Sequence, residues 1–316
     1  MSTILKTHNL TKIFPPAGFT RYKKRKSEGR HAVDHVNMTI RKGDIYGLIG
    51  RNGAGKTTLM RLIAGLMPPT EGTMTLFDST ELEQHRKRTG CIIEAPGLYG
   101  NMSAPDNLEA HRRLLGITSS TAVADSLEAV GLSSTDRKKV KHFSLGMRQR
   151  LGIAMALLGS PDFLILDEPT NGLDPRGIAE IRAVLTRLSQ ERGMTVLISS
   201  HILGELSKLA TCYGIMRGGM LIDEFNRDEL ETRCQRCLKL VVDQPKKAAM
   251  LIETLLDTDN YDILPENTIR LFDYVNQSGL VNRELNQNGI LVESITPVGQ
   301  DIEAYFMSMM GGEDHA

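Results

Sequence analysis

Residues 50–58 of this 316-residue chain read Gly50-Arg51-Asn52-Gly53-Ala54-Gly55-Lys56-Thr57-Thr58. They match the phosphate-binding pattern of a glycine, four residues and then Gly-Lys-Ser/Thr. An apolar run at 45–49 precedes the motif and a helical pattern at 56–66 follows it. The glycines let backbone N–H groups turn toward a polyphosphate, and the helix N-terminus adds its positive end. We therefore expect residues 50–58 to bind a nucleotide, with Lys56 at the β/γ-phosphates and the Thr57 hydroxyl on Mg²⁺.

Two acidic residues, Asp167 and Glu168, follow the apolar run 163–166. Such a run is typical of a strand buried inside a parallel sheet, where ligands gather at the carboxyl ends of the strands. Asp167 is then placed to hold the Mg²⁺ shell, and Glu168 to polarise the water that attacks the γ-phosphate in line. A strand that simply ends in solvated acids explains this pair in isolation, but not its combination with Lys56.

The pattern on either side of these motifs alternates between strands and helices. Strands are expected at 4–13, 36–42, 45–49, 74–77, 163–166 and 194–199, and helices at 56–66, 105–130 with a break near 116–120, 145–158, 176–191 and 202–210. This alternation predicts an α/β domain with a mostly parallel sheet over residues 1–225.

The character changes after residue 225. The expected order is strand 236–242, helix 245–256, strands 260–264 and 267–272, helix 274–286, strand 289–296 and helix 299–309. This βαββαβ order resembles a small α+β ferredoxin-like unit. Residues 226–316 carry no catalytic constellation, so we interpret them as an accessory domain for dimer contact or regulation.

The composition excludes several classes of protein. The 38 Lys+Arg balance the 38 Asp+Glu, so no net charge attracts nucleic acid or an anionic membrane. The longest stretch without a charged residue, 193–204, is shorter than the roughly 18 apolar residues of a membrane span. Residues 1–6 lack the pattern of a signal peptide, and four cysteines make no disulfide framework. A reduced, cytosolic environment is expected.

The basic run Arg21-Tyr22-Lys23-Lys24-Arg25-Lys26 is a local exception to this balance. It is either a solvated loop or a contact for anionic lipid headgroups, each base near such a surface adding about 1 kcal/mol. Nucleic acid is a weaker third reading, and no nucleic-acid partner is expected.

Further motifs narrow the function. Residues 143–150 read Phe-Ser-Leu-Gly-Met-Arg-Gln-Arg before an apolar helix, and residues 171–174 read Asn-Gly-Leu-Asp after the two acids. His201 follows the strand predicted at 194–199, after Ser200. A lone histidine is usually structural, but the end of a neighbouring strand would bring His201 beside Asp167, so we expect it to sense the γ-phosphate.

With these motifs in this order, residues 4–225 resemble the nucleotide-binding subunit of an ABC transporter. The corresponding motifs are Walker A at 50–57, the signature at 144–148, Walker B at 164–168, the D-loop at 171–174 and the switch histidine His201. The resemblance implies a P-loop NTPase fold, ATP hydrolysis with Mg²⁺, and a head-to-tail dimer that traps two ATP. Ser144 and Gly146 of one subunit would close on the γ-phosphate held by Lys56 of the other, with Asp174 of the D-loop also at the nucleotide.

Phe14 is the expected adenine contact, because an aromatic residue near the N-terminus usually stacks on the base in this family. The alternative is a core residue that ends the first strand.

Two departures from the common family pattern are informative. The signature reads Ser-Leu-Gly-Met-Arg in place of Ser-Gly-Gly-Gln-Gln, and Glu94 stands where a glutamine is usual. Together with the C-terminal residues 302–312, they resemble the bacitracin-resistance and lantibiotic-immunity exporters, with other bacterial drug or peptide exporters as the remaining alternative. Their ATPase subunits pair with separately encoded polytopic permeases, which implies a peripheral place on the cytoplasmic face of the bacterial plasma membrane.

In this family, the glutamine usual at that position contacts Mg²⁺ or the attacking water and lies against the permease. The resemblance implies that the Glu94 carboxylate can still bind the metal, while it adds a negative charge beside Asp167 and Glu168.

A soluble ABC ATPase that acts on ribosomes or DNA without a permease is the alternative function. It is disfavoured because such proteins usually carry two cassettes in one chain or a long coiled-coil insertion, and the sequence shows neither. A purely regulatory nucleotide-binding protein is disfavoured because Lys56, Glu168 and His201 are all present.

Overall fold

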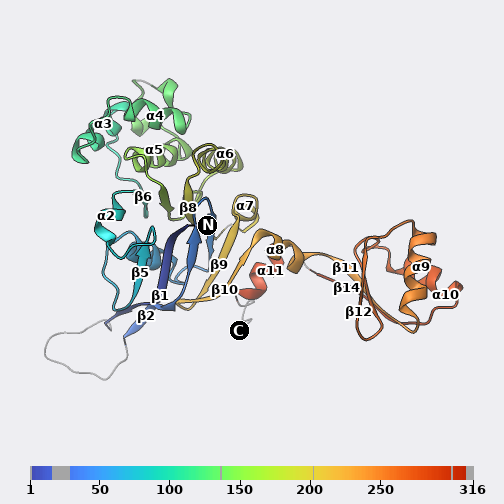
Figure 1. The fold of residues 1–316 in the computed structure, drawn as a ribbon. Helices are drawn as coiled ribbons and strands as arrows, with labels where there is room; N and C mark the ends of the chain where they lie inside the picture. Colours follow the sequence, from blue (N-terminus) through green and yellow to red (C-terminus); the bar gives the residue numbers. More distant parts are fainter. Residues whose placement is uncertain (1, 16–28, 136, 202, 300–301, 311–316) are drawn as a thin grey trace. The chain divides into compact units, whose positions relative to one another are not determined.

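The computed structural model describes residues 2–15, 29–135, 137–201, 203–299 and 302–310. The chain divides into two compact units, Met1–Arg227 and Asp228–Ala316. Figure 1 follows the chain through both units in sequence colours. The basic run 21–26 lies outside the described residues.

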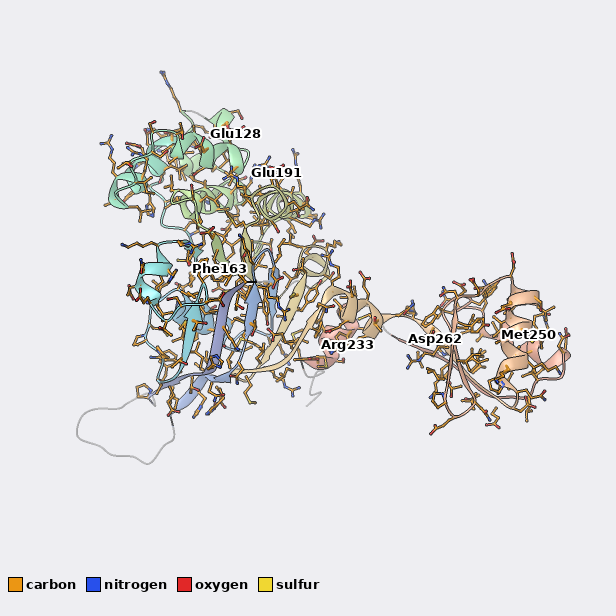
Figure 2. The ribbon with its side chains drawn as sticks, in the orientation of Figure 1. Glu128, Phe163, Glu191, Arg233, Met250 and Asp262 are labelled. Carbon is orange, nitrogen blue, oxygen red and sulfur yellow. The ribbon has the colours of Figure 1, made fainter. Side chains whose placement is uncertain are left out.

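The first unit is built around a six-stranded sheet with the order β10-β9-β4-β8-β7-β6. Its strands are β4 (Ile45–Ile49), β6 (Thr89–Ile92), β7 (Phe163–Leu166), β8 (Thr195–Ser200), β9 (Cys212–Arg217) and β10 (Met220–Asn226). All neighbours run parallel except β10 and β9. Every residue of β4, β7 and β8 is buried, including Phe163, which is labelled in Figure 2. The predicted α/β fold with a mostly parallel sheet is confirmed.

A second sheet of the same unit is antiparallel. Its strands are β1 (Thr3–Phe14), β2 (Arg30–Val36), β3 (Thr39–Arg41) and β5 (Glu71–Leu76), and β1 pairs with the other three. The strand predicted at 36–42 is therefore wrong in part, because β2 ends at Val36 and β3 begins at Thr39. The polar sequence of β2 gives little strand signal, so the strand is stabilised by its backbone pairing with β1 rather than by its own sequence pattern.

The helices of this unit are α1 (Lys56–Ile63), α2 (Leu82–Arg86), α3 (Ala104–Leu114), α4 (Ala122–Ala129), α5 (Leu145–Leu157), α6 (Pro175–Arg192) and α7 (Leu203–Ser207), with short 3₁₀ turns at Ser133–Thr135 and Val140–His142. Figure 1 shows α3, α4 and α5 grouped together, and they pack against one another. Local sequence explains the bounds of α6. Asp174 caps its start by accepting a bond from the Gly177 N–H, and Gly193 ends it in a left-handed conformation at φ 61°.

Helix α8 (Arg227–Cys234) begins at the last residue of the first unit, and the rest of it belongs to the second unit. After α8, the second unit consists of β11 (Cys237–Val242), α9 (Pro245–Leu256), β12 (Tyr261–Leu264), β13 (Thr268–Leu271), α10 (Ser278–Gln287), β14 (Val292–Val298) and α11 (Ile302–Met309). The sheet is antiparallel with the order β12-β13-β11-β14. Its core joins Leu238 and Leu240 of β11 to Ile252 of α9 and Leu285 of α10.

No helix in the described parts of the chain is long and apolar enough to span a membrane.

Candidate functional site

The phosphate loop joins the end of β4 to the start of α1, and its backbone requires glycine. Gly53 and Gly55 have φ values of 83° and 107°, which L side chains rarely adopt. A Cβ atom on Gly55 would lie 2.3 Å from the carbonyl oxygen of Ala32 in β2. The chain can therefore bring backbone N–H groups and the N-terminus of α1 to one place, as an anion-binding loop needs.

Lys56 is the first residue of α1 and is 5% exposed. Its ammonium donates to the carbonyl oxygen of Gly50 at 2.6 Å and lies 3.2 Å from Glu168 Oε1. That carboxylate oxygen is buried and makes no hydrogen bond among the described residues, so the contact with Lys56 is ionic. The ammonium also contacts the carbonyl oxygen of Arg51 at 3.5 Å. A buried cation beside the phosphate loop is suited to binding a highly charged anion.

Asp167 is held through both of its carboxylate oxygens. Thr57 Oγ1 donates to Oδ2 at 2.7 Å, and Ser199 Oγ donates to Oδ1 at 2.6 Å. Asp167 is 7% exposed. A hydroxyl and a carboxylate side by side are hard oxygen donors of the kind that Mg²⁺ takes from proteins. Thr57 and Asp167 therefore fit a Mg²⁺ ion.

Glu168 lies between two basic side chains. Lys56 faces one carboxylate oxygen, and His201 Nδ1 lies 2.6 Å from the other, a distance that fits Nδ1–H donating to it. The backbone of Glu168 is left-handed at φ 49°, an uncommon conformation for a non-glycine residue. Lys56, Thr57, Asp167, Glu168 and His201 thus meet at one edge of the sheet, as their positions at strand ends indicate.

Ser199 belongs to the same cluster and was not identified from the sequence. Besides its bond to Asp167, its hydroxyl accepts a hydrogen bond from the Glu168 N–H at 2.8 Å. The available signal was the position of Ser199 near the end of a buried strand, two residues before His201.

Glu94 lies two residues after β6 in a left-handed conformation, φ 68°. Its carboxylate is 67% exposed and forms an ion pair with the guanidinium of Arg61 on α1. The sequence indicated an added negative charge beside Asp167 and Glu168, but the structure supplies a cation that offsets it. The metal-binding role of Glu94 stays a prediction.

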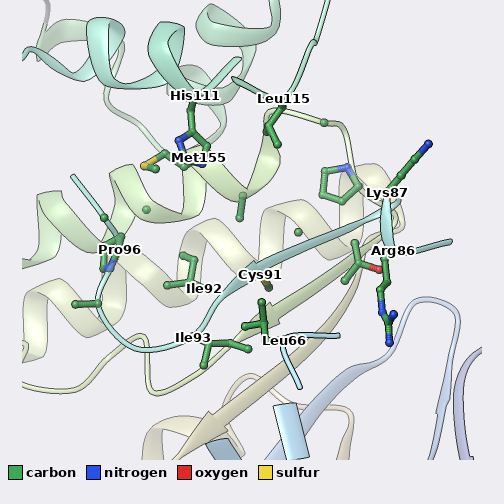
Figure 3. Close-up of a pocket in the computed structure, with 18 residues that line it drawn as sticks. Leu66, Arg86, Lys87, Cys91, Ile92, Ile93, Pro96, His111, Leu115 and Met155 are labelled. Atoms are coloured by element: carbon green, nitrogen blue, oxygen red, sulfur yellow. The ribbon is translucent and has the colours of Figure 1, made fainter. Parts of the chain in front are cut away.

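A cavity of about 460 Å³ adjoins the loop that carries Glu94. It lies between β6, α3 and α5, and Figure 3 shows Ile92, Pro96, His111 and Met155 around it. Most of the labelled lining side chains are apolar. A protein segment with apolar side chains would fit such a cavity better than a phosphate would.

The signature and the D-loop form a separate cluster. Ser144, Gly146 and Asp174 line a cavity of about 510 Å³ between the starts of α5 and α6. Ser144 accepts a bond from the Met147 N–H and caps α5, as Asp174 caps α6. Two helix N-termini, each partly positive, therefore face one cavity.

Phe14 is the last residue of β1, and its ring is 38% exposed. It pairs with Arg30 of β2, whose guanidinium comes within 4.0 Å of the Cβ position at Gly53. This end of the β1–β2 ladder therefore lies near the phosphate loop, with the Phe14 ring open to a ligand on part of its surface.

The remaining predicted nucleotide contacts, Asn52, Ala54 and Thr58, lie in the phosphate loop or on α1.

Comparison with known proteins shows the family. The pattern of the family described as "ABC transporter" matches residues 33–171. The chain is similar to the bacitracin transport ATP-binding protein BcrA of Bacillus licheniformis, with 42% identity over 99% of both chains. It belongs to the ATP-binding subunits of ABC transporters. This ABC ATPase therefore binds and hydrolyses ATP, and the P-loop fold expected from its motifs is confirmed.

Other relatives agree with this assignment. The lantibiotic transport ATP-binding protein SrtF of Streptococcus pyogenes is 47% identical over 66% of this chain and 90% of its own. A dimeric ATP-binding cassette in a post-hydrolysis state, bound to ADP and Pi, matches the ABC ATPase with a TM-score of 0.60 at 25% identity. That match covers 71% of this chain and 99% of the other.

Proposed function

We propose that this ABC ATPase powers the export of antimicrobial peptides, of the bacitracin or lantibiotic kind, through separately encoded polytopic permease subunits. The observation that carries the proposal is the 42% identity to a bacitracin transport ATP-binding protein over 99% of both chains. The relatives support this function rather than action on ribosomes or DNA, since their names describe transport.

The cluster of Lys56, Asp167, Glu168 and His201 accounts for hydrolysis of ATP to ADP and phosphate. Lys56 binds the β- and γ-phosphate oxygens and offsets the charge that builds up on them. Glu168 accepts a proton from the attacking water as that water's oxygen bonds to the γ-phosphorus and the bond to the leaving ADP breaks. His201 orients the Glu168 carboxylate and contacts the γ-phosphate. The loop residues 50–58 donate backbone N–H groups, and Phe14 stacks on adenine.

Mg²⁺ would be held by Thr57 and Asp167, with Glu94 as a further oxygen donor. When bound, it neutralises charge on the phosphate oxygens. The chain's own contribution is orientation, because Asp167 is already held through both oxygens.

A second cassette completes the site in this proposal. Ser144, Gly146 and Asp174 of one subunit would face the γ-phosphate bound at Lys56 of the other, in a head-to-tail dimer. Their shared cavity and the two helix N-termini at its rim support an anion contact there. The dimeric state of the similar ATP-binding cassette supports the arrangement as well.

The permease contact is proposed at the cavity beside Glu94, where an apolar helix face of the permease would fit. Binding there would keep the ABC ATPase at the cytoplasmic face of the bacterial plasma membrane. Residues 21–26 would add a contact to lipid headgroups, although they lie outside the described residues.

The test uses Glu168→Gln, which removes the proton acceptor and keeps the shape of the side chain. We expect hydrolysis to fall about 10²- to 10⁴-fold while ATP and Mg²⁺ still bind, so that the dimer stays closed. The tagged variant is expressed in its source cell and purified from detergent-solubilised membranes. Glu191→Gln, at an exposed position on α6 labelled in Figure 2, is the matched control.

Near-stoichiometric recovery of a polytopic permease with Glu168→Gln supports the proposal. Recovery of ribosomal proteins or DNA-repair factors, with the protein absent from membranes, would overturn it.

A further inference from the structure

We infer that Ser199 is a positioning residue for hydrolysis, because its hydroxyl ties the Asp167 carboxylate to the backbone of Glu168. The inference rests on the proposed roles of those two acids. It adds a residue that no motif of the chain contains.

The position of Ser199 follows from the register of the parallel strands. The last paired residues of β7 and β8 are Leu166 and Ile198. Asp167 is the first residue after β7, and Ser199 is the residue of β8 that follows Ile198. Ser199 and Asp167 are therefore neighbours at the end of the ladder. Ser199 is fully buried, which keeps water from replacing its hydroxyl as the partner of Asp167.

The Ser199 hydroxyl makes one hydrogen bond to each acid, as a donor to the Asp167 side chain and as an acceptor from the Glu168 backbone. It donates to Asp167 Oδ1 at 2.6 Å and accepts from the Glu168 N–H at 2.8 Å. The first bond orients the carboxylate that would hold Mg²⁺, whose other oxygen is bonded to Thr57. A single hydroxyl thus sets the spacing between a metal-binding side chain and the backbone of the general base.

The hydrogen bond from the Glu168 N–H to Ser199 matters because the backbone of Glu168 is left-handed. A left-handed backbone is uncommon for a residue that is not glycine, and it persists only where its surroundings hold it. In that conformation Glu168 presents its carboxylate to Lys56 and His201. The bond from the Glu168 N–H to Ser199 is one of the contacts that hold it there.

The experiment compares Ser199→Ala with Thr195→Val. Thr195 is also buried on β8, and its hydroxyl accepts a bond from the Gly43 N–H at 2.9 Å, at the strand end away from the acids. Both variants remove one buried, hydrogen-bonded hydroxyl from the same strand. ATPase rates, ATP affinity with EDTA, the Mg²⁺ concentration for half-maximal rate and the melting temperature are measured for each.

We expect Ser199→Ala to lower kcat about 10- to 100-fold and to raise the half-maximal Mg²⁺ concentration, with metal-free ATP affinity unchanged. Thr195→Val should lower the melting temperature to a similar degree and leave kcat near the wild-type value. Equal kcat values for Ser199→Ala and the wild type, or an equal loss in both variants, would overturn the inference.

Two further variants cover the case in which Ser199→Ala does not fold and separate the role of Ser199 from that of Glu168. If Ser199→Ala does not fold, Ser199→Cys keeps a side chain of similar size with a weaker donor. We expect a reduced kcat for it, and a wild-type kcat would overturn the inference. Glu168→Gln separates the two proposals. Slow hydrolysis in Glu168→Gln with normal hydrolysis in Ser199→Ala removes only the role of Ser199, whereas normal hydrolysis in Glu168→Gln removes the role of Glu168 and the inference with it.

Discussion

The two units of the chain bury different kinds of side chain. The first unit buries Lys56, Asp167 and Ser199 at the ends of β-strands and the start of a helix. Among the described residues of the second unit, the one buried polar residue is Thr268, and no charged side chain is buried. Its charged residues Lys239, Asp262 and Arg270 are instead exposed and paired in register on β11, β12 and β13.

The first unit buries charged and polar side chains that can take part in binding or catalysis, whereas the second unit buries mainly apolar side chains that pack together. A buried charge is costly unless partners surround it, so a fold keeps one where binding or catalysis needs it. The second unit follows the opposite rule, with an apolar core and a charged outer face. We therefore expect substitutions in the first cluster to change rates, and substitutions in the second core to change stability.

Among the variants that compare the two units, Lys56→Ala is expected to have the largest effect. Loss of the ammonium removes the cation beside the phosphates and leaves Glu168 Oε1 buried without its ionic partner. We expect kcat to fall about 10²- to 10³-fold, together with weaker ATP binding, in a steady-state ATPase assay and a nucleotide titration. Lys208→Ala, which breaks an exposed ion pair with Glu205, is the control and should hydrolyse ATP normally. Normal hydrolysis by Lys56→Ala would contradict the expectation that substitutions in the first unit's cluster change the rate of hydrolysis.

The next effect is on stability. Ile252→Ala empties a fully buried position of α9 and should destabilise the second unit by about 2–5 kcal/mol, measured by urea unfolding. ATP affinity should not change. Met250→Ala, on the same helix but 67% exposed and labelled in Figure 2, should alter stability by no more than about 0.5 kcal/mol. Lost ATP binding in a folded Ile252→Ala protein would show that the second core supports the nucleotide site.

The smallest effect is expected at the edge of the first cluster. Glu94→Gln breaks an exposed ion pair with Arg61, so the free energy of unfolding should change by less than about 1 kcal/mol. ATP binding should stay intact, while hydrolysis stimulated by the permease, or export, should change. Arg61→Gln breaks the same pair and keeps the carboxylate, so it separates the two effects. Unchanged stimulated ATPase and unchanged resistance in Glu94→Gln would contradict a specialised role for this loop.

Local pattern predicted the elements that surround the site and missed several strands at the edges of the sheets or next to an edge. The runs at 45–49 and 163–166 are apolar throughout and coincide with β4 and β7. The strands β2, β6, β9 and β10 were not predicted. They are short or partly polar, and they form because a neighbouring strand accepts their backbone hydrogen bonds.

The site shows the same division. Motif spacing identified Lys56, Thr57, Asp167, Glu168 and His201, and the structure brings them together. Motif spacing could not reveal Arg61 as the partner of Glu94 or Ser199 as the partner of Asp167, because each pair joins residues far apart in the chain.

By itself, the sequence determined the phosphate loop, the acids at the end of β7 and the family, because these depend on residue types at fixed spacing. The tertiary structure decided which carboxylate oxygen meets which donor, which charge offsets Glu94 and how Glu168 is held in a left-handed conformation. Those features depend on strand register and on contacts between distant segments. A local pattern carries no information about such contacts, because the packing of the whole unit selects them.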